Sequence, residues 1–300
     1  MVHKEQLTLT DNGLLVRAPA KINLTLLIAG KRPDGFHNIE TVMAKVNWYD
    51  QLLIARAGKP GIHLQCAGEY WAPEGENNIV YKACEMICER HGQKPRLKVT
   101  LTKNIPAGSG LGSASSDAAA ALIGLNQLLE LNLQPEELLQ MAAQLGSDVA
   151  FFLDGPLALC TGKGEKINKL PQIFDFSALL ILPDVSVSTK KVYSDYTHDS
   201  NLYEALSTQI NARLAENRID LAAKMCANML ERSCFHLHQQ LAELKTDIES
   251  LGRRPVCLSG SGSTMFVIVS DPDSDDILKY QSILSRELGC KSVLVSNNRW

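Results

Sequence analysis

The chain has 300 residues, of which 45% are hydrophobic, so it is long enough for two domains with substantial cores. Its formal net charge of −3 gives no electrostatic basis for binding nucleic acid or an anionic membrane. Residues 1–11 carry charges without the apolar core of a signal peptide, and no apolar run approaches a membrane span. We therefore expect a cytoplasmic enzyme with neither a nucleic-acid nor a membrane partner.

The first hundred residues are expected to form strands over 14–29 and 42–54, followed by a helix over 79–91. A further strand is expected over 97–103, because apolar Leu97, Val99 and Leu101 alternate with polar residues. An alanine-rich helix follows, with leucines at helical spacing. Ser115, Ser116 and Asp117 are residue types that cap the beginning of a helix.

The connection between that strand and that helix is rich in glycine and serine and runs from Pro106 to Asp117. Glycines at 108, 110 and 112 allow the backbone to turn its N–H groups inward, and the helix behind them adds the positive end of its dipole. No lysine follows Gly112 as in a Walker loop, and Ser113 stands where a dinucleotide loop has its third glycine. The loop is thus another kind of phosphate site or a plain turn.

A second helix is expected from Pro135 to Leu145, where an early proline and acidic residues begin it and Gly146 ends it. Asp148 then stands between Gly146 and the apolar run 149–153, so a partly buried carboxylate with a partner is expected. Lys21 similarly interrupts an apolar strand. Residues alone leave a structural ion pair or an N-cap aspartate as the alternative.

The second half is expected to open with a buried strand over 178–182 and to continue with helices over 200–215, 217–231 and 235–251. Strands over 256–258 and 265–269 are expected to pair around the loop Ser259 to Ser263. We place the domain boundary near Leu170-Pro171, which gives domains 1–170 and 171–300.

The eight cysteines stand at positions 66, 84, 88, 160, 226, 234, 257 and 290, with neither a CxxC pair nor a zinc spacing. Cys84, Cys88 and His91 fall on one predicted helix, where a buried apolar role is more common than a metal site. Reduced thiols, as in a cytosol, are expected.

Four segments together resemble, in order and spacing, the motifs of the GHMP small-molecule kinases: 19–24, 106–117, 146–152 and 259–263. Segments 31–37 and 187–193 are similar to one branch of this family. That branch phosphorylates a cytidine diphosphate conjugate of methylerythritol. The resemblance extends from about residue 17 to residue 295, and six motifs in order are specific where any one is weak.

The resemblance implies an α+β fold with a left-handed βαβ N-terminal domain that binds ATP and a ferredoxin-like C-terminal domain that closes over the substrate. It also implies transfer of the γ-phosphoryl group of ATP to the C2 hydroxyl of the methylerythritol unit, in the non-mevalonate route to isoprenoids. Mg²⁺ is expected to travel with ATP, held by Ser116 or by the phosphates alone, since no acidic cluster is evident. The choice between monomer and homodimer stays open.

The same matching implies roles for single residues. Asp148 falls on the catalytic aspartate and Lys21 on its partner lysine, and either removal of the hydroxyl proton or stabilisation of late charge fits the aspartate. Asn78 and Lys103 fall beside the adenine pocket, although Lys103 also suits a solvated strand end. Cytosine would lie between Phe36 and Tyr193 with its edge read by His37, and Asn23 and Thr189 would lie near the substrate. The remaining ATP contacts would come from Pro106, Ala107, Gly108, Ser109, Gly110, Leu111, Gly112, Ser113, Ala114, Ser115 and Ser116.

The chain departs from the family pattern at a few of these positions. Ser109, Ser113 and Ala114 stand where glycine is frequent, Phe36 where tyrosine is frequent, and Ala150 where proline is usual. Another GHMP kinase acting on mevalonate, phosphomevalonate or homoserine is the rival within the fold, and Phe36, His37 and Tyr193 favour the cytidine branch over it. A catalytically silent sensor is the rival from another class, but it would have lost Lys21 or Asp148.

Overall fold

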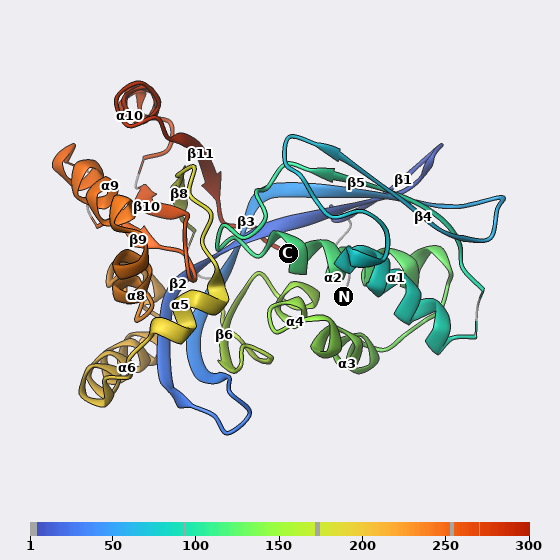
Figure 1. Ribbon diagram of the computed structural model, residues 1–300, viewed down its shortest axis with the longest axis horizontal. Helices are drawn as coiled ribbons and strands as arrows, with labels where there is room; N and C mark the ends of the chain where they lie inside the picture. Colours follow the sequence, from blue (N-terminus) through green and yellow to red (C-terminus); the bar gives the residue numbers. More distant parts are fainter. Residues whose placement is uncertain (1–4, 93, 172–174, 253–254, 270) are drawn as a thin grey trace.

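The computed structural model describes residues 5–92, 94–171, 175–252, 255–269 and 271–300. Two halves, each with its own sheet, are joined by two long strands that run through both of them (Figure 1). These strands are β2 (Gly13–Lys31) and β3 (His37–Arg56), and they pair antiparallel with register shifts after Pro19, Asn23 and Ile28.

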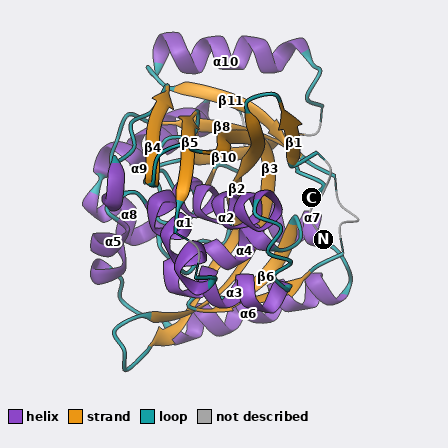
Figure 2. Ribbon diagram, turned by 90° about the vertical axis from the view of Figure 1, so that its right-hand side faces the viewer, coloured by secondary structure: helices purple, strands orange, loops and turns teal. Residues whose placement is uncertain are grey.

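The first half is a seven-stranded sheet with helices on one face (Figures 1 and 2). The order β1-β2-β3-β5-β4 is extended by β6, which pairs with the part of β3 that β5 leaves free, and by β7. Strands β4 and β5 are parallel and are connected through α1, which makes a βαβ unit. The other elements of this half are β1 (Leu7–Thr10), β4 (Gly61–Gly68), η1 (Gly75–Asn77), α1 (Ile79–Arg90), β5 (Arg96–Lys103), α2 (Ser113–Leu128), α3 (Pro135–Leu145), α4 (Val149–Leu153), β6 (Leu157–Gly162) and β7 (Lys166–Lys169).

The second half is a four-stranded antiparallel sheet in the order β11-β8-β10-β9. Numbered within this half the order is 4-1-3-2, which is the ferredoxin-like arrangement that the family resemblance implies. Its elements are β8 (Ser177–Leu182), α5 (Thr189–Asp195), α6 (Ser200–Ala215), α7 (Ile219–Lys224), α8 (Glu231–Leu237), α9 (Gln239–Ser250), β9 (Cys257–Leu258), β10 (Met265–Val269), α10 (Asp275–Glu287) and β11 (Lys291–Ser296).

The long strands contribute to the core of each half. Val16 and Ile54 pack in the first core, beneath α1 and α2, whereas residues 26–28 and Ile39 pack with the second core. Residues of both sheets, among them Ile22 and Phe266, share a third cluster between the halves. The ends of β2 and β3 therefore belong to different cores, while their middle lies at the junction.

Most of the predicted elements are present, but two of the predicted helices are wrong. The helix expected over 217–231 ends at Lys224, because Cys226 takes a left-handed φ of 47° and Asn228 instead bridges to Leu26 of β2. The helix expected over 235–251 is divided at His238, where the backbone leaves helical geometry (φ −138°, ψ 74°). The expected cap of α2 is also wrong, because Gly112 precedes the first turn and residues 115–117 lie inside it.

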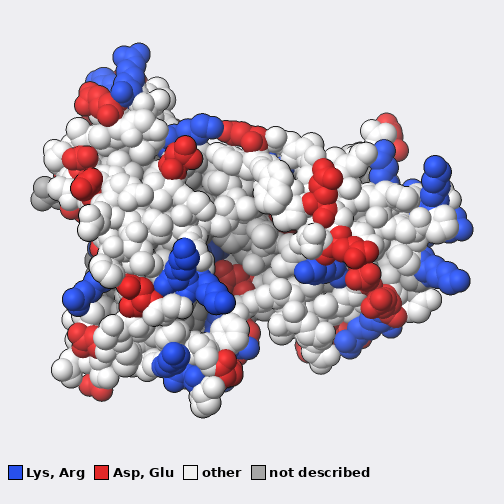
Figure 3. Space-filling model, in the orientation of Figure 1, with Lys and Arg blue, Asp and Glu red and all other residues white. Residues whose placement is uncertain are grey.

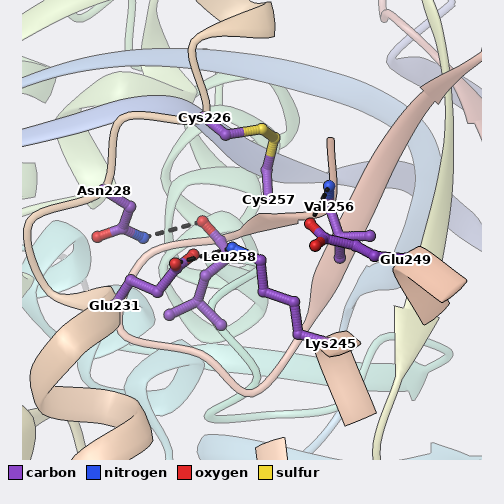
Figure 4. The surroundings of a disulfide bond; sticks show 8 residues. All are labelled: Cys226, Asn228, Glu231, Lys245, Glu249, Val256, Cys257 and Leu258. Atoms are coloured by element: carbon purple, nitrogen blue, oxygen red, sulfur yellow. Dashed lines mark hydrogen bonds and ion pairs between the residues drawn. A yellow bond between two sulfur atoms is a disulfide. The ribbon is translucent and has the colours of Figure 1, made fainter. Parts of the chain in front are cut away.

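The expectation of reduced thiols is wrong for two of the eight cysteines. Cys226 and Cys257 form a disulfide that joins the segment after α7 to β9 (Figure 4). Their Cα atoms lie 5.0 Å apart although 31 residues separate them along the chain. No sequence spacing indicates this pair, because only the folded chain brings the segment after α7 next to β9.

Among the described residues, no helix combines the length and apolar character needed to cross a membrane.

Candidate functional site

Lys21 lies in the middle of β2, at the junction of the two halves, and only 3% of its surface is exposed. Its Nζ donates hydrogen bonds to Asn23 Oδ1 at 2.6 Å and to the Gly110 carbonyl at 2.7 Å. Burial lowers the pKa of Lys21, and the carboxylate of Asp148 acts in the opposite direction. The ammonium is therefore held by fixed acceptors in a place with little water.

Asp148 precedes α4 and lies 3.9 Å from this ammonium, measured from Oδ2 to Lys21 Nζ. About a third of its side chain (34%) is exposed, whereas the lysine is buried. Its side chain does not cap α4, which removes the simple N-cap interpretation. The carboxylate thus faces both a buried cation and solvent, an arrangement that suits contact with a bound hydroxyl.

Two glycine-containing loops meet beside Lys21: residues 106–117, the first loop, and residues 259–263, the second loop. The Gly110 carbonyl accepts from both Lys21 Nζ and Ser259 Oγ, the latter at 2.9 Å. Thr264 N–H donates to the Ser109 carbonyl at 3.1 Å, so the second loop is bonded to the first along its length. A Cβ placed on Gly110, which has a φ of +82°, would lie 2.1 Å from the Ser259 carbonyl oxygen. Only glycine fits this approach of the two loops.

The backbone of the first loop suits a bound polyphosphate. Gly108, Gly110 and Gly112 all take a left-handed φ between +68° and +82°, which is the alternation that turns successive N–H groups toward one side. The loop leads into α2, a helix of 16 residues whose first N–H groups have no partner within the helix. Gly108 is exposed, with no protein atom within 4 Å of its Cβ position, so the loop is accessible at this residue.

Lys103 lies below this loop and is 1% exposed, so the interpretation as a solvated strand end is wrong. Its ammonium bonds Asp50 and Ser113, and it bonds Asp117 Oδ2 at 2.6 Å. Asp50 Oδ1 also accepts the N–H groups of Asn104 and Ile105. Both ends of the loop are therefore fixed to one buried ion cluster, and Lys103 supports the loop through it.

Asn78 and Ser116 are likewise buried. Asn78 Oδ1 accepts from Val80 N–H at the start of α1, and its amide donates to the Pro73 carbonyl at 2.7 Å. Ser116 Oγ has no hydrogen-bond partner among the described residues. Within those residues, no group of three or more His, Cys, Asp and Glu side chains is placed to hold a metal ion. A contact of Asn78 with adenine stays a prediction.

The residues expected to contact the acceptor lie around the tip of the β2–β3 hairpin and α5. His37 stacks on Tyr193 with ring centroids 5.4 Å apart, while Phe36 is 54% exposed and has Lys163 Nζ 4.8 Å from its ring centroid. Burial and the charge of Asp148 raise the pKa of Tyr193. The structure thus brings Tyr193 near Asp148, with one face of its ring stacked on His37.

Asn23 and Thr189 lie closer to the loops. Asn23 is buried beside Lys21, and its amide donates to Thr41 Oγ1 at 2.8 Å. Thr189 begins α5, and its hydroxyl lies 2.8 Å from Ser261 Oγ in the second loop. Asn23 and Thr189, which are predicted to lie near the substrate, are therefore bonded to residues of the site: Asn23 to Lys21, and Thr189 to Ser261 of the second loop.

Two residues of this region, Asn228 and Lys163, were not expected from the sequence, and Ser259 was expected only as part of the motif 259–263, without a role of its own. Ser259 joins the two loops. Asn228 fixes the second loop by donating to the carbonyl of Leu258 at 2.9 Å (Figure 4) and to that of Gly260 at 2.8 Å. Lys163 lies in the turn between β6 and β7. An asparagine and a lysine in turns carry no signal of their own, because only the folded chain brings them to the site.

The surface seen in Figure 3 is hollowed between the two halves, with charged side chains at its floor. Lysine, arginine and carboxylate side chains are interspersed on this face. A cavity of about 390 Å³ lies elsewhere, next to Phe176, Lys224 and Arg299, and includes none of the predicted site residues. We regard the place where Lys21 and Asp148 meet the two loops as the candidate active site.

Comparison with known proteins defines the class. Residues 78–156 match the family described as GHMP kinases N terminal domain, and residues 210–281 match GHMP kinases C terminal. The chain belongs to the GHMP kinase family, a family of ATP-dependent phosphotransferases, and has its α+β fold.

The relatives give a narrower class. The chain is 37% identical over 263 residues to 4-diphosphocytidyl-2-C-methyl-D-erythritol kinase of Syntrophomonas wolfei, covering 87% of this chain and 91% of the relative. It is 34% identical over 256 residues to the protein of the same name in Bacillus subtilis, with coverage of 85% and 88%. A crystal structure of 4-(cytidine 5'-diphospho)-2C-methyl-D-erythritol kinase superimposes with a TM-score of 0.74 at 30% identity, over 95% of this chain and all of the other. A homoserine kinase from Cytophaga hutchinsonii shares the fold at 20% identity (TM-score 0.73; 100% and 96% covered).

Proposed function

We propose that this protein transfers the γ-phosphoryl group of ATP to the C2 hydroxyl of 4-diphosphocytidyl-2-C-methyl-D-erythritol, in the cytoplasm. The observation that supports it most directly is the pair formed by buried Lys21 and partly exposed Asp148 beside two glycine loops that are bonded to each other. The relatives above bear the name of this reaction, and the pair offers the chemistry that the reaction needs.

The residues would divide the work as follows. Asp148 accepts the proton of the acceptor hydroxyl while that oxygen bonds to the γ-phosphorus and the bond to the β,γ-bridging oxygen breaks. Lys21 keeps the carboxylate charged and stabilises negative charge on the acceptor oxygen, since it is fixed by Asn23 and Gly110. The N–H groups of the 106–116 loop and of the first turn of α2 bind the phosphates.

Mg²⁺ belongs to the same proposal. When bound, the ion would neutralise phosphate charge, and we propose that phosphate oxygens hold it. The acceptor side rests on Phe36, His37 and Tyr193, with the cytosine ring taking the place on Tyr193 that the His37 ring occupies in this structure.

The experiment is to measure ADP release from the purified protein with Mg-ATP and each of four acceptors: 4-diphosphocytidyl-2-C-methyl-D-erythritol, mevalonate, phosphomevalonate and homoserine. We expect turnover with the cytidyl compound alone, and loss of at least about a thousandfold in kcat for Asp148→Asn with ATP binding retained. Turnover with another acceptor would overturn the substrate assignment, and normal turnover by Asp148→Asn would overturn the role of the carboxylate.

A further inference from the structure

Asp148 is presented by one of the shortest helices in the structure. Helix α4 has five residues, Val149–Leu153, and Asp148 directly precedes it. A helix of this length has almost no stability of its own, so its position must come from contacts with the rest of the protein. Four of its five residues are buried in the first core, which fixes the face that the helix packs against the rest of the protein. The contacts at its two ends then decide how Asp148 is placed.

Lys45 of β3 holds the C-terminal end of α4, and only 2% of the surface of this lysine is exposed. Its Nζ donates to the carbonyl of Phe152 at 3.1 Å and to the carbonyl of Asp154 at 2.6 Å. The backbone N–H of the same lysine donates to the carbonyl of Pro156 at 2.8 Å. Three carbonyls of the segment 152–156 are therefore bonded to one residue, at a helix end whose carbonyls have no partner within the helix.

Lys45 stands directly opposite Lys21 in the register of β2 and β3. Residues opposite each other on neighbouring strands present their side chains on one face, about 5 Å apart. Five helical residues span about 7.5 Å. One cross-strand pair of lysines therefore contacts both ends of the same helix, with Lys21 at Asp148 and Lys45 at the final carbonyls.

Among the residues that the structure describes, the ammonium of Lys45 contacts these carbonyls and forms no ion pair. The carboxylate of Asp154 lies 2.5 Å from Lys169 Nζ, at the protein surface, so Lys45 has carbonyl partners instead. A cation near the C-terminus of a helix is favourable because of the helix dipole. Burial lowers the pKa of Lys45 to about 7, with Asp154 and Lys169 as the charged groups that act on it. A buried amine in such a costly position has a specific task more often than an exposed one.

We propose that Lys45 is a positioning residue for phosphoryl transfer: it fixes the end of α4 and thereby holds Asp148 at its distance from Lys21. This inference rests on the proposed function, in which Asp148 acts on the acceptor hydroxyl. Lys45 touches neither substrate in this proposal, so its effect is on the rate of the chemical step and not on binding.

The test compares Lys45→Met with Lys169→Met in the full-length protein. Methionine fills the space of the lysine stem and removes the donor, and Lys169 bonds the same segment from the exposed side. For Lys45→Met we expect kcat to fall about tenfold or more, since displacement by about 1 Å can cost this much. The KM values for ATP and acceptor should stay within about twofold. Lys169→Met should leave all three constants within the same limit.

Two results would overturn the inference. One is a Lys45→Met enzyme with unchanged kcat, and the other is a parallel loss of ATP affinity and folded protein, which marks a merely structural lysine. Asp148→Asn in the same assay keeps the two proposals apart: if it stays active, the proposed role of Asp148 fails, and if it is inactive while Lys45→Met is fully active, only the inference about Lys45 fails. If Lys45→Met does not fold, the test uses Lys45→Gln, which retains an N–H donor. A fall in kcat with unchanged KM values then supports the inference, and an unchanged kcat overturns it.

Discussion

Among the described residues, three lysine side chains are buried, and each has a different kind of partner. Lys21 has an amide oxygen, a carbonyl and a carboxylate, Lys45 has carbonyls, and Lys103 has the carboxyl groups of Asp50 and Asp117. Buried charges need such partners, and removing one partner from a pair is strongly destabilising. The three lysines thus mark the three points at which β2, β3 and β5 support the site.

Asp117 gives a prediction about pH. Burial and the neighbouring Asp50 raise the pKa of Asp117 to about 8, from an ordinary value of 3.8. Between about pH 4 and pH 8 the folded protein therefore keeps a proton that the unfolded chain has already released. The unfolding free energy falls as the pH rises through this window. We expect the unfolding free energy of the natural protein to decrease between pH 5 and pH 9 relative to Asp117→Asn.

Urea unfolding of both proteins at several pH values measures this difference. Curves that stay parallel across the window would show that Asp117 is already ionised at pH 5. The Asn104 side chain, which donates to the Tyr49 carbonyl above the same cluster, offers a control in Asn104→Ser, for which no change in pH dependence is expected.

At the scale of single residues, the sequence predicts which residues belong to the site better than it predicts their burial and their partners. Lys21 and Asp148 are found from their motifs, and the structure brings them within 3.9 Å. The interpretation of Lys103 as a solvated strand end is wrong, because the period of two places it on the buried face of β5 together with Val99 and Leu101. Its carboxyl partners come from positions 50 and 117, which the local pattern does not indicate. The partners of a buried charge are long-range features that a local pattern does not contain.

At the scale of elements, the glycine loop is set by its contact with the second loop. Gly110→Ala places a Cβ 2.1 Å from the Ser259 carbonyl oxygen and also requires a left-handed φ. We expect the KM for ATP to rise more than tenfold, because displacement of the Ser259 carbonyl adds to the roughly 1–2 kcal/mol that the left-handed conformation costs. Gly108→Ala has a similar φ with nothing within 4 Å, so its effect should be clearly smaller.

Steady-state kinetics at saturating acceptor measure both variants. Equal effects of the two alanines would mean that conformation alone matters and that the contact with Ser259 does not constrain the loop.

The elements were predictable where periodicity is long and failed where tertiary contacts replace a helix. Strands β2, β3 and β5 and helices α1, α2, α3 and α6 lie where the sequence places them. The stretch 225–230 has helical composition, yet Asn228 donates to two carbonyls of the second loop instead of continuing a helix. Helix α4 was not expected, because five apolar residues carry too short a period to distinguish helix from strand.

At the scale of the whole molecule, the disulfide is the testable link. Cys226–Cys257 ties the segment after α7 to β9, just before the second loop (Figure 4). Reduction should lower the unfolding free energy by roughly 2–4 kcal/mol, as for other cross-links of this span. We expect a thiol reductant to lower the unfolding temperature of the natural protein and to leave that of a Cys226→Ser, Cys257→Ser double variant unchanged.

Differential scanning calorimetry with and without reductant provides this comparison. An oxidised natural protein that responds no more than the double variant would show that the cross-link adds nothing to stability.

The class of the whole molecule was predictable from six motifs in order, and the family comparison confirms it. The division into domains at residue 170 stays a prediction. What local patterns could not indicate is that the two halves share strands, since residues 26–28 and Ile39 lie in the core of the second half.

This sharing has a consequence for the chain as it leaves the ribosome. Leu26, Leu27 and Ile28 are made early, but their partners in the second core, such as Leu179 and Leu258, are made late. Until those partners emerge, the apolar end of the hairpin has nothing to pack against, and exposed apolar strands favour aggregation. The nascent protein therefore spends most of its synthesis with an uncovered hairpin, so its yield in the cell depends on the speed of translation and on chaperones as well as on the stability of the finished fold.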